Sequence, residues 1–380
     1  ARASTGLPLA AALVALVAAG CDGFSFQGFL DQPVPIALRQ GIPVTPVAHA
    51  GREFQAVIDT GSPLNVVERS GNGSRANSSL RLKMARPPGV TRFVFDNLEL
   101  HDLKLGSTGV DQPLSFKARI GAPLLRRFSV SLAYGSAPTL TLSDAVPDTL
   151  AELAGECDFD KLAGADSTER CIGVFGASLV GGGVVEVGGE LQNLSSTRLM
   201  LTTCLMPAPF DRTKRASHGA EATTGVPAVA WIATGFGTSI ISRRAFERLR
   251  KLNPALKETP GARLYLPGGS EAVSTTRLPR VALVSNETGE LGPCGELALR
   301  RRLVIGGRAP LSDADRELLE DKGANGASVA YVAADPGVRF AILRDSSPLL
   351  QGIRREVQPI VADVDVVLGG SFLQQFTTTL

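Results

Sequence analysis

One carboxylate in a tight loop is the clearest chemical feature of the first half of the chain. The apolar stretch Phe54-Gln-Ala-Val-Ile58 runs directly into Asp59-Thr60-Gly61-Ser62. The glycine permits a tight backbone, and the neighbouring hydroxyls are of the type that donate hydrogen bonds to a carboxylate. Such a loop can hold an aspartate as general base for a water molecule. An Asp before Thr-Gly is also an ordinary turn signal, so the loop needs support from other segments.

That support comes from a weak internal repeat. A later segment of the first half reads Ile120-Gly121-Ala122-Pro-Leu-Leu125-Arg-Arg-Phe128, and Leu368-Gly369-Gly370-Ser-Phe-Leu373-Gln-Gln-Phe376 near the end of the chain resembles it. The second half also has an apolar strand that runs into Ala233-Thr234-Gly235-Phe236-Gly237-Thr238-Ser239. Each half therefore combines a loop after an apolar strand with a later strand that ends in glycine.

These four blocks, in this order, resemble the pepsin and retropepsin superfamily of aspartic proteases over about residues 34 to 380. The resemblance implies a mainly β, bilobal fold: two pseudo-symmetric β-barrel-like lobes with a few short helices. It also implies two facing aspartates that share a proton and activate a water molecule for peptide hydrolysis. Asp59 matches the catalytic aspartate of the first lobe, with Thr60, Gly61 and Ser62 in support.

The second loop departs from the family pattern because it has no carboxylate. Aligning Gly237-Thr238-Ser239 on the family's Gly-Thr-Ser places Gly235 at the aspartate position and Phe236 at the position of the bracing threonine. The alternative takes Ala233-Thr234-Gly235 as the triplet, followed by a two-residue insertion, and places Ala233 at the aspartate position. Both alignments predict that the second catalytic acid is missing.

Two further acids precede the second glycine strand, and neither is a good substitute. Asp363 and Asp365 alternate with Val364 and Val366, which predicts that both carboxylates face solvent. Any aspartic endopeptidase activity is therefore expected to be weak or lost. Two other functions stay open: a pseudopeptidase that binds an extended peptide by strand addition, and a structural envelope lipoprotein.

Residues 1–21 have the layout of a secretory signal peptide. Arg2 precedes an apolar run from Leu7 to Ala19, which is short for a membrane span. The ending Val17-Ala-Ala-Gly-Cys21 resembles a bacterial lipobox, whose cysteine receives lipid. Lipid on Cys21 would anchor a periplasm-facing protein of the cell envelope to a membrane. An ordinary signal peptide that happens to contain a cysteine is the alternative.

The four other cysteines are an even number, as expected in an oxidising compartment. Three pairings are possible; we favour Cys157–Cys171, which are close in sequence, and therefore Cys204–Cys294. A metal site is less well supported because the chain has no CxxC spacing and its three histidines are scattered. We expect no cofactor and no metal.

Composition agrees with a β-rich globular protein and indicates no nucleic-acid partner. The chain has 39 basic and 37 acidic residues, so its formal charge of +2 creates no strong field. We expect a monomer whose partner is a peptide or protein.

Helices are predicted after Ser242 and after Ser312, each of which could serve as the N-cap. The expected organisation is a signal peptide (1–21), a tether (22–33), a first lobe (34–145), a connector or insertion (146–195) and a second lobe (196–380).

Overall fold

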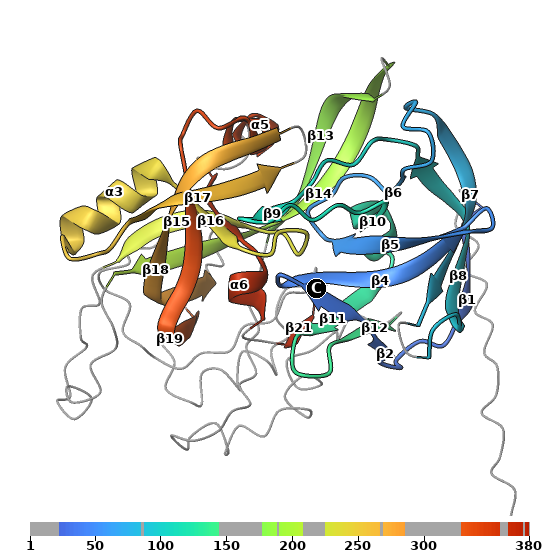
Figure 1. Ribbon diagram of the computed structural model, residues 1–380, viewed down its shortest axis with the longest axis horizontal. Helices are drawn as coiled ribbons and strands as arrows, with labels where there is room; N and C mark the ends of the chain where they lie inside the picture. The colour runs from blue at the N-terminus through green and yellow to red at the C-terminus, as the bar shows by residue number, and fades with distance from the viewer. Residues whose placement is uncertain are drawn as a thin grey trace, which may run out of the picture.

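The computed structural model describes residues 23–84, 87–143, 177–187, 190–207, 225–266, 269–285, 328–357, 364–374 and 377–379. Within these residues the fold is mainly β, with a few short helices. The strands of the first half (blue to teal) lie on one side of Figure 1, and most strands of the second half (yellow to red) lie on the other.

Six strands of the first half form a closed barrel. They are β4 (Ile42–His49), β5 (Arg52–Asp59), β6 (Val66–Val67), β7 (Arg75–Lys83), β8 (Thr91–His101) and β10 (Ala118–Gly121). The circuit runs β4-β5-β10-β6-β8-β7, and β7 returns to β4. Two edge strands are added: β1 (Ser25–Gly28) on β8 and β3 (Ala37–Arg39) on β4. Part of the segment expected to be a tether is therefore a strand of this sheet, with Phe24 and Phe26 buried.

The second half repeats this circuit strand for strand. Its members are β14 (Glu190–Met206), β15 (Val226–Ile232), β16 (Ser239–Ser242), β18 (Gly269–Ser285), β19 (Ser328–Leu343) and β20 (Val364–Leu368). They pair in the order β14-β15-β20-β16-β19-β18, and β18 pairs back to β14. Two further strands extend the sheet: β13 (Ala177–Val187) on β14 and β17 (Thr259–Leu266) on β18. β14 runs through residue 195, where the connector was expected to end.

Two pairings connect the halves. β11 (Ser129–Ala133) and β12 (Thr139–Ser143) form a small sheet with β2 (Val34–Pro35) and with β21 (Thr377–Thr379) from the end of the chain. β9 (Gly109–Val110), from the first half, pairs antiparallel with β17 of the second half. Figure 1 shows both connections between the two groups of strands.

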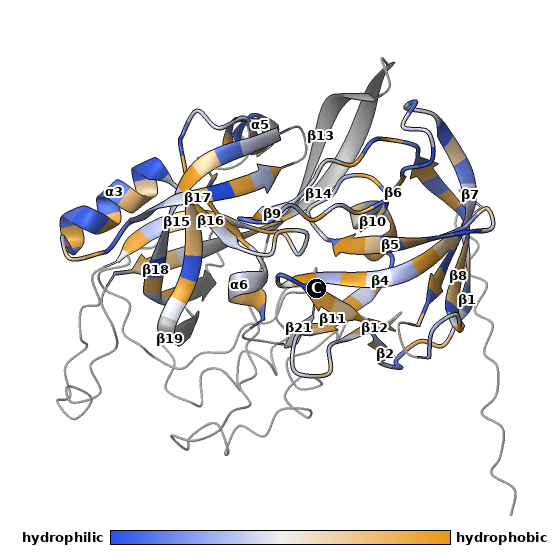
Figure 2. Ribbon diagram, viewed as in Figure 1, coloured by the Kyte–Doolittle hydropathy of each residue, from blue (hydrophilic) through white to orange (hydrophobic). Residues whose placement is uncertain are grey.

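The helices within the described ranges are short. They are α1 (Ala122–Leu125), α3 (Arg243–Leu252), α5 (Pro348–Val357) and α6 (Gly370–Leu373). The helix predicted after Ser242 is confirmed as α3: the Ser242 hydroxyl accepts the N–H of Ala245 at 3.1 Å, which caps the helix. Figure 2 shows α3 as mostly hydrophilic, and its buried residues include Phe246 and Leu249. The helix predicted after Ser312 lies outside the described residues.

Aromatic packing fills the first barrel. Phe93 and Phe95 alternate along β8 toward the interior and are fully buried. Phe26 from β1 packs on both, with ring centroids 5.7 and 5.6 Å away, and Phe128 meets Phe26 edge-on at 5.1 Å. This packing gives a rigid support for the loop that follows β5. None of the helices in the described ranges is long and apolar enough to cross a membrane.

Candidate functional site

The Asp59 loop and the Ala233 loop occupy equivalent places in the two circuits. β10 runs parallel to β5, with Gly121 beside Asp59, and β20 runs parallel to β15 with Leu368 beside Ile232. The N–H of Ala233 then donates to the carbonyl of Leu368 at 3.1 Å. Ala233 therefore holds the place in the second half that Asp59 holds in the first.

Backbone hydrogen bonds repeat at the same offsets in both loops. The Ser62 N–H donates to the Asp59 carbonyl at 3.1 Å, and the Phe236 N–H donates to the Ala233 carbonyl at 3.2 Å. The carbonyls of Ser62 and Phe236 then accept the first N–H of the following helices α1 and α6, at 2.8 and 2.7 Å. Phe236 is thus the counterpart of Ser62, and it does not replace a threonine.

The glycine strands are held in equivalent ways as well. The Gly121 N–H donates to the Asn65 side chain at 2.9 Å, and the Gly369 N–H donates to the Ser239 hydroxyl at 3.1 Å. Asn65 and Ser239 stand the same number of residues after Asp59 and Ala233. The two loops have equal length from Asp59 to Asn65 and from Ala233 to Ser239, so the structure favours Ala233-Thr234-Gly235 as the triplet over the alignment that places Gly235 at the aspartate position.

The two loops are locked together by a pair of buried threonines. The Thr234 hydroxyl accepts the N–H of Thr60 at 3.0 Å and donates to the carbonyl of Ile58 at 2.7 Å. The reciprocal bonds of the Thr60 hydroxyl are longer, 3.5 Å to the carbonyl of Ile232 and 3.4 Å from the N–H of Thr234. This exchange holds the ends of β5 and β15 at a fixed separation.

Asp59 lies against the opposite loop. Its Oδ1 accepts the N–H of Gly61 at 2.9 Å and the N–H of Gly235 at 3.2 Å. Its Oδ2 lies 3.5 Å from Nε of Arg119. A β-carbon at Gly235 would come within 2.6 Å of Oδ1, so only glycine leaves room for the carboxylate here. Asp59 therefore has donors beside both oxygens and no carboxyl partner among the described residues.

The indole ring of Trp231 fills the space beside Gly61 of the first loop, which is equivalent to the space beside Gly235 that the Asp59 carboxylate fills. The ring lies against Gly61, where a β-carbon would be 2.9 Å from Cε2 of the ring and 2.9 Å from Cβ of Ala233. Phe236 packs edge-on against the ring, with centroids 5.8 Å apart. Asp59 fills the room beside Gly235 with a carboxylate, whereas Trp231 fills the room beside Gly61 with an apolar ring.

Ser62 does not support Asp59 as expected. Its hydroxyl donates to the carbonyl of Leu64 at 2.8 Å and accepts the Leu64 N–H at 3.4 Å, which closes a local turn. The loop residues Gly237 and Thr238 continue the second loop into β16, and Ser239 begins that strand.

The prediction that the Asp365 side chain faces solvent is wrong, because this side chain is buried. The same prediction for Asp363 concerns a residue outside the described ranges.

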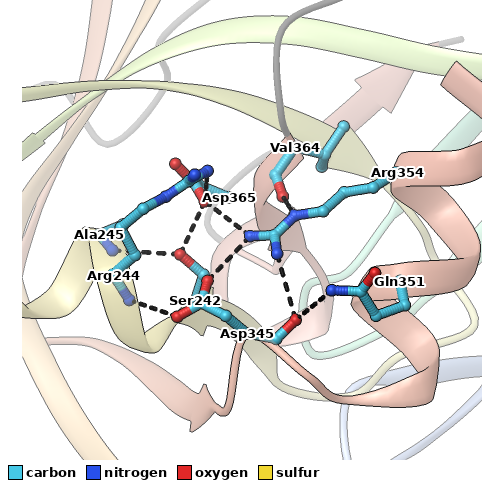
Figure 3. A network of polar contacts seen from close by, with 8 residues as sticks. All are labelled: Ser242, Arg244, Ala245, Asp345, Gln351, Arg354, Val364 and Asp365. Atoms are coloured by element: carbon cyan, nitrogen blue, oxygen red, sulfur yellow. Dashed lines mark hydrogen bonds and ion pairs between the residues drawn. The ribbon is translucent and has the colours of Figure 1, made fainter. Parts of the chain in front are cut away.

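Asp365 is buried in an ion-pair network (Figure 3). Its Oδ1 accepts from the Ser242 hydroxyl and the Arg244 guanidinium at 2.8 Å each, and from Arg354 at 3.0 Å. Arg354 also donates to Asp345 at 3.0 Å. Alternation along β20 failed as a guide because Arg244 of α3 and Arg354 of α5 reach the Asp365 carboxylate and satisfy it in the interior. The carboxylate is engaged by these partners, none of which belongs to the Asp59 loop.

The cysteines are only partly described. Cys204 is buried in β14 and is disulfide-bonded, so its partner is one of the cysteines outside the described residues. Its pairing with Cys294, the Cys157–Cys171 bridge and the lipid on Cys21 stay predictions. Among the described residues, no group of three or more His, Cys, Asp and Glu side chains could hold a metal ion.

A short segment of the first half, β9 with Asp111, contacts the second half outside the two loops. Asp111, directly after β9, donates its N–H to the carbonyl of Arg263 at 2.8 Å, and its carboxylate accepts the N–H of Arg263 at 3.1 Å. The same carboxylate pairs with Arg339 at 3.3 Å. Val110 donates its N–H to the Gln40 side chain at 3.3 Å. A segment of the first half is thereby added as a strand to the edge of β17.

The sequence did not single out Arg119 and Trp231. Arg119 directly precedes Ile120-Gly121, and Trp231 stands two residues before Ala233, at the place that Val57 has before Asp59. Aligning the two loops, and separately the two glycine strands, places Trp231 opposite Val57 and Val367 opposite Arg119. No protein-family model matches the chain, and no curated protein sequence matches it. The geometry of the site is therefore the basis for a functional assignment.

Proposed function

We propose that the chain is a bilobal, pepsin-like envelope protein that binds an extended peptide between its lobes and does not hydrolyse it. Two matching six-strand circuits and interlocked Thr60 and Thr234 loops support the bilobal fold. The lipobox ending at Cys21 supports anchoring on the periplasmic side of a membrane.

The proposal rests on what occupies the position of the second catalytic carboxylate. Aspartic peptidases need two carboxylates, one to take a proton from water and one to donate a hydrogen bond to the peptide carbonyl. Ala233 stands at the position of the second carboxylate, and the Trp231 ring fills the space beside Gly61 that such a carboxylate would need. Asp59 alone leaves the carbonyl without its acid partner.

Strand addition is the binding mode that the fold favours. β9 already adds to the edge of β17, with main-chain hydrogen bonds and the Asp111–Arg263 exchange across the junction. Extended peptides bind proteins in the same way, with backbone hydrogen bonds for affinity and side-chain contacts for specificity. The β9–β17 pairing is an internal example of the binding mode that we propose for the peptide, and it occupies that edge of β17 at Leu264 and Tyr265.

The chain contains one tryptophan, Trp231, so its fluorescence reports on the site directly. The test titrates the full-length protein with extended, amidated peptides, and mass spectrometry follows the same peptides from about pH 3 to about pH 8. We expect a saturable fluorescence change while every peptide stays intact. The Trp231→Phe variant is the matched control that must lose the signal.

Two results would overturn the proposal. Cleavage that disappears in an Asp59→Asn variant would assign an aspartic endopeptidase. Absence of binding by any peptide, measured by calorimetry as well as by fluorescence, would favour a structural lipoprotein.

A further inference from the structure

Arg119 projects from the barrel wall toward Asp59. Its neighbours on β10, Ala118 and Ile120, are almost fully buried in the core of the first half. Because side chains alternate along a strand, Arg119 points to the opposite face, where its Nε lies 3.5 Å from Oδ2 of Asp59. About a fifth of the Arg119 side chain is exposed, 18% by area, while its Nε is buried.

The counterpart of Arg119 in the second half is apolar. Val367 pairs with Trp231 across β20 and β15 as Arg119 pairs with Val57 across β10 and β5. Val367 is fully buried in a cluster that contains Trp231, Ala233 and Phe236. Among the residues that the structure describes, the site therefore has a cation on its first-half side and apolar side chains on its second-half side.

The donors of Arg119 are not all used. Its Nε is buried and makes no hydrogen bond within the described part of the chain. The nearby Oδ2 of Asp59 is at ion-pair distance, while Oδ1 of Asp59 takes the N–H groups of Gly61 and Gly235. A guanidinium group has five N–H donors in a planar fork that matches the two oxygens of a carboxylate.

We propose that Arg119 recognises an internal acidic side chain of the bound peptide, in competition with Asp59. This inference rests on the proposed peptide binding and names its specificity. A carboxylate of the peptide would form a charge-assisted, bidentate hydrogen bond with Arg119. Asp59, retained without a catalytic partner, then acts as the internal ligand that occupies Arg119 when no peptide is bound.

The experiment compares three peptides of one extended, apolar sequence. The first has Glu at the central position and an amidated C-terminus, the second has Gln there, and the third has Gln with a free C-terminal carboxylate. Calorimetry gives the affinity of each for the parent protein and for the Arg119→Gln, Asp59→Asn and Arg81→Gln variants. Arg81 is an exposed arginine of β7 and serves as the matched control.

In the parent we expect the Glu peptide to bind about tenfold more tightly than either Gln peptide. The Arg119→Gln variant should bind the Glu and Gln peptides equally, and Arg81→Gln should keep the preference. The Asp59→Asn variant should enlarge the preference, because it removes the internal competitor; a merely structural ion pair would not give this result. Circular dichroism melting verifies that each variant is folded.

Equal affinity for the Glu and Gln peptides in the parent would overturn the inference while leaving peptide binding intact. Retention of the preference in Arg119→Gln would also overturn it, as would tight binding of only the free C-terminal carboxylate. Failure of all three peptides to bind the parent would overturn the proposed function together with this inference.

Discussion

The indole ring of Trp231 packs on Gly61 in the space that mirrors the one filled by the Asp59 carboxylate beside Gly235. The two loops are otherwise alike in backbone hydrogen bonds and in their threonine braces. The second loop has therefore kept its architecture while an apolar ring replaces a charged group. That combination supports the proposal that the site has the shape of a two-acid site without the second acid.

The threonine braces should contribute unequally to stability. The Thr234 hydroxyl makes bonds of 3.0 and 2.7 Å, whereas those of Thr60 measure 3.4 and 3.5 Å. We expect Thr234→Val to lower the free energy of unfolding by about 3 kcal/mol, because it leaves a buried N–H and a buried carbonyl without their partner. Thr60→Val should cost about 1 kcal/mol.

Urea unfolding of Thr234→Val and Thr60→Val measures the loss in the free energy of unfolding that each substitution causes. Thr238→Val is the matched control, since Thr238 lies in the same loop and its side chain makes no hydrogen bond with any described residue. Equal losses for Thr234→Val and Thr238→Val would contradict the role assigned to the brace.

The buried carboxylate of Asp365 should be the main contributor in the network of Figure 3. Removing it in Asp365→Ala leaves Arg354 buried without that charge, and breaking a buried pair costs about 3 to 5 kcal/mol. Asp345, which is 38% exposed, pairs with the same arginine, so Asp345→Ala should cost about 1 kcal/mol or less. Thermal or urea unfolding of the two variants tests this order. A loss in Asp345→Ala as large as in Asp365→Ala would show that the network is not centred on Asp365.

Asp102 should make stability depend on pH. Burial alone would raise its pKa, but hydrogen bonds from the Ser70 hydroxyl and the N–H groups of residues 69–71 outweigh this and hold the pKa below its ordinary value. A depressed folded-state pKa stabilises the protein above the unfolded pKa of about 3.9, and the contribution is lost as pH falls toward the folded-state pKa. We expect Asp102→Asn to cost about 2 kcal/mol at neutral pH and progressively less in acid.

Urea unfolding of the parent and Asp102→Asn at several pH values gives this dependence. Asp31→Asn is the control, because Asp31 is exposed and its side chain makes no hydrogen bond within the described ranges. A cost for Asp102→Asn that stays constant down to about pH 2 would contradict the linkage.

Local sequence signals anticipated several elements correctly. Ser242 followed by the segment 243–252 predicted α3 with its N-cap. Asp59-Thr60-Gly61 was placed at the end of a buried strand, where the structure has it. Each of these features depends on contacts between residues close in the chain.

Contacts between distant segments could not be predicted in the same way. Asp365 is buried because α3 and α5 bring Arg244 and Arg354 to it, and no periodicity within β20 contains that information. The role of Trp231 follows from its contact with Gly61 of the other half, which the local sequence around Trp231 does not predict. The correct alignment of the second loop likewise depends on its spatial equivalence to the first.

The proposal that Ala233 and Trp231 replace the second catalytic acid is tested most directly by rebuilding that acid. In the first half Val57 and Asp59 stand where the second half has Trp231 and Ala233, so the variant Trp231→Val/Ala233→Asp copies the first half.

The measurement is cleavage of a denatured protein substrate at acid pH by the parent, by Ala233→Asp, by the double variant and by the double variant with Asp59→Asn. We predict no cleavage by the parent and none by Ala233→Asp, whose new carboxylate has no room beside the indole ring. The double variant should cleave, and adding Asp59→Asn should abolish that cleavage, because the proton-sharing pair is then broken. Cleavage by the parent that Asp59→Asn removes would contradict the account, since it would mean that another acid already completes the site.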